Sequence, residues 1–311
     1  MSVGESKVSI YAAMVANLAI AVAKFVGAAL SGSSAMLSEG IHSLVDTANE
    51  VLLLYGLARS QRSPDEAHPL GYGQELYFWS LIVAVLIFAL GGGVSIYEGF
   101  KSIQHPEPST NAVISYGVLA AAALFEGTAL AISLRQFNRS DVNRSDVNQR
   151  QPLWRAIRQS KDPSAFVVIV EDGAALMGLL LAFGGVFLSE RTGNSFYDGV
   201  ASIAIGLLLT VVAIALVAET KGLLIGESAA PAIRESIRDI VQKDAAVTRM
   251  EPPITLHLGP QDILVAMNIE FQDALSADEI EAATRRLEKK IRESHGEVKR
   301  IFLEAASVVS S

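Results

Sequence analysis

The stretch SGSSAMLSEGIHSLVD, residues 31–46, joins two apolar runs and places charged side chains inside the second. The runs, at about 9–31 and 35–58, are each long enough to cross a bilayer as a helix. Glu39, His42 and Asp46 lie within the second run, where a charge at mid-bilayer costs about 2.5–3.5 kcal/mol on insertion scales. The stretch therefore predicts a membrane helix whose polar residues pair, line a cavity or bind something.

Composition supports a membrane protein. Half of the 311 residues are hydrophobic and 19% are charged, whereas soluble domains carry about 25% charged residues. The net charge of −8 argues against a nucleic-acid partner, which requires a basic surface. No cysteine is present, so a metal would be bound by imidazole and carboxylate groups.

Six runs qualify as membrane spans, which predicts a transmembrane domain over residues 1–227. They lie at about 9–31, 35–58, 76–103, 113–134, 165–189 and 197–224. Basic residues concentrate in the loop at 135–164, so this loop and both termini are expected in the cytoplasm. The same loop holds a tandem duplication at 138–147, interpreted as a flexible polar linker. The N-terminus has no signal-peptide pattern, which favours a bacterial inner membrane.

From residue 228 to 311 the pattern becomes that of a small soluble domain. DILVAMNIEF, residues 262–271, alternates apolar and polar residues as a strand with one buried face does. The segment from Ser276 to Gly296 begins with a capping box, in which Glu279 is the partner, and predicts a helix. With a helix at about 230–242 and strands near 247–257 and 298–305, the expected order is α-β-β-α-β.

The polar residues of the second span share one face. At about 100° per residue, Glu39, His42 and Asp46 form a single stripe along a helix. The fifth span contributes the adjacent pair Glu171 and Asp172 near the middle of its apolar run. One imidazole with carboxylates from two helices is a ligand set for a divalent transition metal, most often zinc. The alternative is that these groups only hold the helices together.

Several motifs resemble those of the cation diffusion facilitator family. They are SGSSAMLSEGIHSLVD, HPLGYGQE, KDPSAFVVIVEDGAALMG and NSFYDGVASIAIG…LLIGESA, which occur in the family's order over nearly the whole chain. The resemblance implies six transmembrane helices, a ferredoxin-like cytoplasmic α+β domain, a homodimer in the lipid membrane, and metal efflux driven by proton exchange. It also implies a transported divalent cation, with no prosthetic group and no enzymatic activity.

The resemblance assigns the transport site to His42 and Asp46 in the second span and to Asp172 in the fifth. The fourth family position falls on Val168, which cannot bind a metal. Glu171, Glu39 or water could fill it, with Glu171 ranked first. Glu39 could instead orient the His42 ring.

Other positions match the family in part. Asp65 and His68 correspond to a second, weaker site, whose later histidine is replaced by Tyr72. In the soluble domain, Asn268 and Phe302 stand where the family usually has histidine ligands, so no tightly bound cluster is expected there.

The expected function is efflux of Zn2+, or of Mn2+, Fe2+ or Co2+, in exchange for protons, with His42 and Glu126 as candidates for proton coupling. Metal binding requires neutral imidazole and ionised carboxylates, and it therefore releases protons. Two alternatives remain: a non-transporting regulatory or scaffold subunit, and a membrane metal hydrolase. The hydrolase is disfavoured because the chain has no His-Glu-x-x-His motif.

Overall fold

The computed structural model describes residues 3–106, 111–142 and 163–307. The tandem duplication and most of the basic residues used to predict orientation fall outside these residues or their described side chains. The chain divides into two compact units. The first comprises Met1–Leu57, Phe78–Ile157 and Pro163–Thr220, and the second comprises Ala58–Tyr77, Arg158–Asp162 and Lys221–Ser311.

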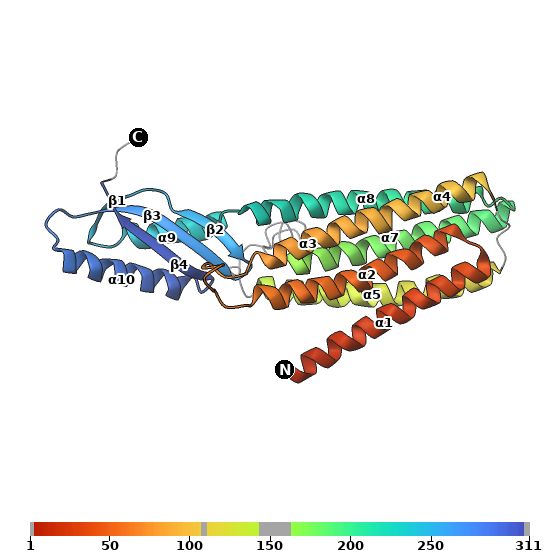
Figure 1. Ribbon diagram of the computed structural model, residues 1–311, viewed down its shortest axis with the longest axis horizontal. Coiled ribbons are helices and arrows are strands. Elements are labelled where there is room, and N and C mark those ends of the chain that lie inside the picture. The colour runs from red at the N-terminus through yellow and green to blue at the C-terminus, as the bar shows by residue number, and fades with distance from the viewer. Residues whose placement is uncertain (1–2, 107–110, 143–162, 308–311) are drawn as a thin grey trace. The chain divides into compact units, whose positions relative to one another are not determined.

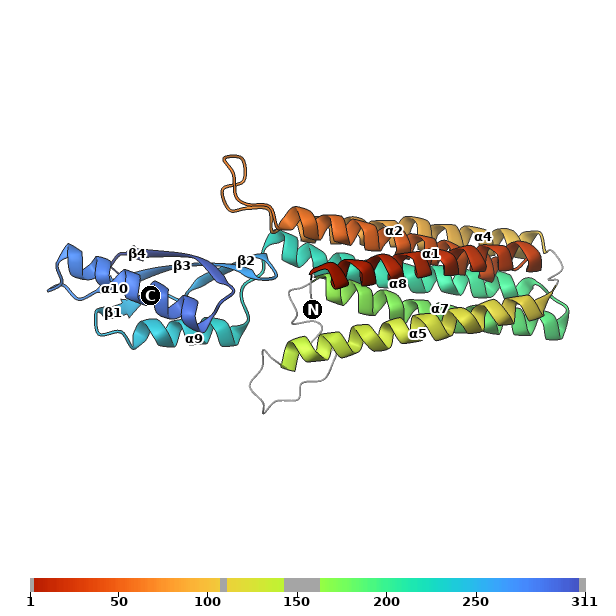
Figure 2. The same cartoon turned by 90° about the horizontal axis from the view of Figure 1, so that it is seen from below.

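The first unit is a bundle of long helices at the places where the sequence predicts spans (Figures 1 and 2). Its helical segments are α1 (Val3–Ser31), α2 (Ser34–Ser60), α3 (Glu75–Leu86), η1 (Ile87–Gly93), α4 (Val94–Gln104), α5 (Ala112–Val142), α7 (Pro163–Thr192) and α8 (Phe196–Ile225). Within the described residues, four stretches are long and apolar enough to cross a membrane: Glu75–Gln104, Ala112–Arg135, Phe166–Thr192 and Phe196–Ile225. The helix α2 does not meet this criterion because it carries the polar stripe.

The third span is interrupted by η1, a seven-residue π-helix that the apolar pattern did not predict. The third span packs against α8 through glycines, and in each of the two helices these glycines are seven residues apart. A Cβ on Gly92 would stand 2.6 Å from Thr210 Oγ1, and a Cβ on Gly99 would stand 2.6 Å from the Gly199 carbonyl oxygen. Small residues permit this close approach, which is how membrane helices pack without a hydrophobic driving force.

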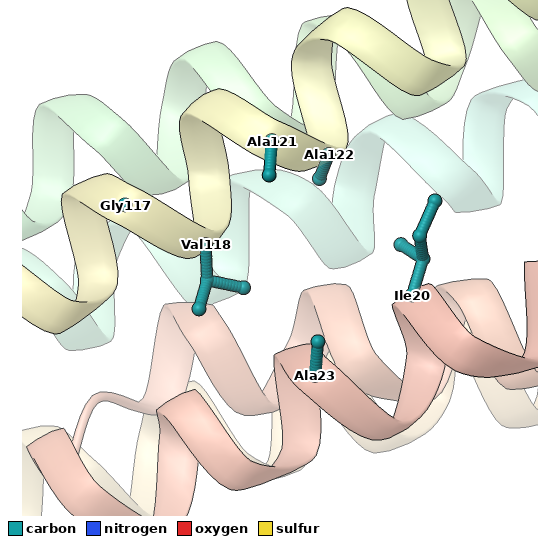
Figure 3. Close-up of a pocket in the computed structure, with 6 residues that line it drawn as sticks. All are labelled: Ile20, Ala23, Gly117, Val118, Ala121 and Ala122. Carbon is teal, nitrogen blue, oxygen red and sulfur yellow. The ribbon is translucent and has the colours of Figure 1, made fainter.

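Small residues also line a cavity of 170 Å³ between α1 and α5 (Figure 3). Its walls are apolar and are formed by Ile20, Ala23, Gly117, Val118, Ala121 and Ala122. Because it offers almost no polar group, this cavity does not resemble an ion site.

A buried carboxylate fixes the start of α2. Asp198 of α8 is 3% exposed and accepts hydrogen bonds from the Ser33 hydroxyl (2.6 Å), the Ser34 amide (2.6 Å) and the Ser34 hydroxyl (2.9 Å). The first amides of a helix have no partner within the helix, and a negative charge there is favoured by the helix dipole. Asp198 therefore sets the position of the helix that carries His42.

The second unit contains a four-stranded sheet with two helices on one face. Its elements are α9 (Pro231–Gln242), β1 (Val247–Met250), β2 (Ile254–Gly259), β3 (Asp262–Phe271), α10 (Ala277–Ser294) and β4 (Val298–Ala305). The strand β3 pairs with β1 and β2 antiparallel and with β4 parallel. The single strand predicted at 247–257 was wrong: it is two strands, because Pro252 and Pro253 cannot donate ladder hydrogen bonds.

The core of the soluble domain follows the predicted alternation. Every second residue of β3 is buried, from Ile263 to Phe271, against Leu287 and Ile291 of α10 and Ile237 of α9. The capping box at the start of α10 is present as predicted: Ser276 Oγ accepts from the Glu279 amide, and Glu279 accepts from the Ser276 amide. These contacts define a small α+β domain that follows the membrane helices in the sequence.

Replacing Asp198 with Ala is expected to destabilise the bundle by about 1–3 kcal/mol, because buried donors at the start of α2 lose a charged acceptor. Thermal unfolding of the detergent-purified full chain measures the effect. Asp198→Asn, which keeps one acceptor oxygen, should lose less. Equal stability of the Ala variant and the wild type would show that this contact does not hold α2.

Asp244 predicts a pH dependence in the soluble domain. Arg286 donates two hydrogen bonds to its carboxylate, at 2.6 and 2.8 Å, which together with the Ala246 amide and Lys290 lowers the pKa of Asp244 to about 2. The carboxylate therefore stabilises the fold above about pH 4, its unfolded pKa being about 3.9, and this contribution is lost as the pH falls toward 2.

Asp244→Asn should accordingly lower stability by about 1–2 kcal/mol at pH 7, a modest value because Arg286 is partly exposed. The difference from wild type should shrink between about pH 4 and pH 2, as followed by hydrogen exchange of the full chain. Asp239→Asn, in an exposed ion pair with Lys243, is the control. A difference that stays constant down to pH 2 would contradict this assignment.

Candidate cation site in the helical bundle

The predicted stripe on α2 faces the interior of the bundle. Glu39 and His42 are 0% and 1% exposed, and the side chain of Asp46 is 19% exposed. On the opposite side of α2, Leu44 and Val51 are exposed, as expected for residues that contact lipid. The helix therefore keeps its polar groups away from the hydrocarbon, as the helical period predicts.

His42 and Asp46 form the central pair of the stripe. Nδ1 of His42 lies 3.3 Å from Oδ1 of Asp46, one helical turn away. This pair does not meet the geometry of a hydrogen bond, and neither ring nitrogen of His42 has a hydrogen-bond partner within the part of the chain that the structure describes. An imidazole buried without a partner in an apolar bundle is costly, which is typical of a group that receives a proton or a cation.

The acidic pair on α7 contacts two different helices. Glu171 accepts a hydrogen bond of 2.6 Å from the amide of Asn49 on α2, and Asp172 accepts one of 3.2 Å from Ser133 on α5. Adjacent helical positions diverge by about 100°, so the two carboxylates do not point the same way. Glu171 is therefore directed toward α2, the helix that carries His42 and Asp46, while Val168 is half-buried one turn earlier.

Asp46 lies within electrostatic range of several other charged side chains. Glu171, Asp172, Glu126 and Lys24 all lie close enough to Asp46 to interact with its charge. Among the residues that the structure describes, however, no three histidine, aspartate or glutamate side chains are grouped closely enough to hold a metal ion. The candidate ligands thus stand as pairs on facing helices, and a shared ion would require their side chains to turn toward one another.

Glu39 has a partner other than His42. Its carboxylate forms a buried ion pair with Lys24 of α1, with Nζ 3.1 Å from Oε2. Lys24 also donates a 2.6 Å hydrogen bond to Ser43 and lies 3.7 Å from Glu126 of α5. The structure does not pair Glu39 with the His42 ring, the orienting role considered from the sequence.

Asn49 and Glu50 also belong to the polar face of α2, although neither was predicted from the sequence. Asn49 is fully buried and bonds Glu171, while Glu50 accepts a 2.6 Å hydrogen bond from Asn17 of α1. The spacing of the sequence could have predicted Glu50, because His42, Asp46 and Glu50 follow one another at intervals of four residues. The polar stripe therefore extends a full turn beyond the predicted residues.

The side chains predicted to form the second site, in the loop between α2 and α3, are bonded to neighbouring residues of that loop. Asp65 accepts a 2.6 Å hydrogen bond from the Tyr72 hydroxyl and one of 2.8 Å from the His68 amide, which lower the pKa of its carboxyl group. The rings of His68 and Tyr72 lie 4.2 Å apart. In the soluble domain, Asn268 donates to Glu251 and Phe302 is exposed. Tyr72 thus engages the carboxylate that a metal would need.

Comparison with known proteins identifies the class. The model of the cation efflux transmembrane domain matches residues 10–225, which is more than half of the chain. The chain therefore belongs to the cation diffusion facilitator family, a family of membrane transporters rather than enzymes. It is an integral membrane protein.

The relatives indicate the range of cargoes within the family. The chain is 33% identical to the mitochondrial proton-coupled zinc antiporter SLC30A9 of Xenopus laevis over 78% of its own length and 42% of the relative's. It is 33% identical to metal tolerance protein C4 of Arabidopsis thaliana, covering 78% and 52% of the two chains. It is 23% identical to the manganese efflux system protein MneP of Bacillus subtilis, over 77% and 75%. The chain thus spans about half the length of the first two relatives.

Proposed function

We propose that this protein exports a divalent transition-metal cation across its membrane in exchange for protons, with zinc as the preferred cargo. The observation that carries the proposal is the buried His42, which has no hydrogen-bond partner among the described residues and lies beside Asp46, whose charge interacts with the carboxylates of α7. One imidazole with several carboxylates suits zinc and tolerates manganese, iron and cobalt. Similarity to proteins named as zinc antiporters and a manganese efflux protein supports the same range.

The proposed ligands are His42, Asp46 and Asp172, with Glu171 in the place that Val168 leaves without a donor. Glu171 is favoured over Glu39 because its hydrogen-bond partner, Asn49, is on the helix of the other ligands, whereas Glu39 is paired with Lys24. A neutral amide is a weaker competitor for a carboxylate than a buried ammonium is. Glu171 can therefore exchange Asn49 for a cation at lower cost.

Proton exchange follows from the chemistry of these ligands. A cation binds the deprotonated imidazole and carboxylates, so protons and metal compete for the same atoms. When the site opens to the cytoplasm a metal displaces protons, and when it opens to the other side protons displace the metal. His42 is the proposed proton carrier, with Glu126 a second candidate because it lies beside Lys24 in the same interior.

The protein is further proposed to act as a homodimer, with both termini in the cytoplasm of a bacterial cell. The sheet face opposite the helices of the soluble domain supports self-association, because Ile254 and Phe302 are 70% and 57% exposed there. Both pair with Ala266 of β3, so the three residues form one apolar row across the sheet. Residues 1–227 and 228–311 are assigned to transport and to dimerisation, respectively.

A regulatory subunit that does not transport is the second candidate. It is favoured by Val168 at a ligand position and by the absence, among the described side chains, of a ready cluster of three ligands. Transport by the purified chain alone separates the two functions.

Full-length protein in vesicles containing a zinc-sensitive dye should take up zinc when a pH step is imposed. His42→Ala and Asp46→Ala should each reduce the initial rate by about 10- to 100-fold, since each removes a ligand. His105→Ala, an exposed histidine at the end of α4, and Asp239→Ala are matched controls that should transport normally. Wild-type uptake in both ligand variants would refute the site, and no flux in the wild type would favour the regulatory function.

A further inference from the structure

Lys24 is a cation buried inside the membrane bundle. It is 0% exposed and contacts groups on two neighbouring helices: Ser43 Oγ at 2.6 Å and Glu39 Oε2 at 3.1 Å on α2, and Glu126 Oε1 at 3.7 Å on α5. Two carboxylates therefore share one ammonium. Replacing a buried ion pair with apolar residues is often neutral or stabilising, so stability alone does not account for this arrangement.

Glu39 is the neighbour of the proposed cation site along α2. It lies one helical turn from His42, and its second carboxylate oxygen is buried with no hydrogen-bond partner among the residues described. That oxygen lies against α7, where a Cβ on Gly178 would stand 2.3 Å from Oε1. The glycine leaves room for the carboxylate beside the helix that carries Asp172. Among the described residues, the ammonium of Lys24 is thus the group that competes with a cation for the carboxylate of Glu39.

We propose that Lys24 determines metal specificity by holding Glu39 and Glu126 away from the transported cation. With both carboxylates engaged, the site keeps one imidazole among a small number of oxygen donors, which favours zinc. Without Lys24, additional carboxylates join the site and favour manganese, a cation that prefers oxygen ligands. Lys24 is a positioning residue, since it acts through the two carboxylates. The inference rests on the proposed function.

The test measures zinc and manganese binding to the detergent-purified full chain by competition with a metal-sensitive dye. Lys24→Met and Lys24→Gln remove the charge, and Gln retains a hydrogen-bond donor for Ser43 and Glu39 so that the fold is disturbed less. Both variants should lower the ratio of zinc to manganese affinity by about tenfold. Mutations of residues that hydrogen-bond to metal ligands change metal affinity by about this factor. Lys24→Arg, which keeps the charge, should retain the wild-type ratio.

Lys101→Met is the matched control, because Lys101 is exposed and pairs with Glu98 at the end of α4. A ratio within about twofold of wild type in the neutral Lys24 variants would overturn the inference. So would an equal loss of affinity for both metals, because a purely structural role predicts that result. If the wild-type chain bound neither metal, the proposed function itself would fail, and this outcome is distinct from a wild type that binds zinc while the ratio is insensitive to Lys24.

Discussion

Ionisable groups inside an apolar helical bundle must be compensated, and this constraint organises the membrane unit. Every spanning backbone is helical because no water is available to satisfy its polar groups. The buried side chains follow the same rule: Asp198 is satisfied by the start of α2, Lys24 by Glu39, and Glu171 by Asn49. His42 differs from these three, because neither of its ring nitrogens has a hydrogen-bond partner among the described residues. The cost of burying this imidazole without a partner connects the fold to the proposed cation transport.

The buried polar groups separate into those that hold the helices together and those of the proposed cation site. Asp198 positions α2 from the side of the bundle where α8 begins, and Lys24 joins α1, α2 and α5. The glycines of η1, α4 and α8 bring a further pair of helices into close contact, beside a hydrogen bond from the Ser202 hydroxyl to the Ser95 carbonyl. Between these elements, His42 lies 3.3 Å from Asp46 without a hydrogen bond, and Asn49 donates to Glu171. Movement of these groups would leave the contacts made by Asp198 and Lys24 in place.

Local periodicity made most of the fold predictable. The positions of the helical spans, the polar stripe of α2, the alternation of β3 and the capping box of α10 all follow from patterns within one element. The break between β1 and β2 was equally local, since Pro252 and Pro253 mark it, but it was missed.

The remaining features depend on contacts between distant residues. Asp198 and Ser34 are 164 positions apart, and no sequence pattern links them. The partner of Glu39 is set by the packing of α1 against α2, so the sequence left open whether it was a ligand. The π-helical geometry of η1 likewise depends on how its glycines meet α8. Membership of the family could be inferred from the motifs, whereas the pairing of the charges required the structure.

X-ray absorption spectroscopy of the full chain loaded with one equivalent of zinc tests the central claim most directly. The account predicts one imidazole nitrogen together with carboxylate oxygens at about 2.0–2.2 Å, and loss of the imidazole signal in the His42→Ala protein. An imidazole signal that persists unchanged in His42→Ala would place the zinc on another histidine and contradict the account.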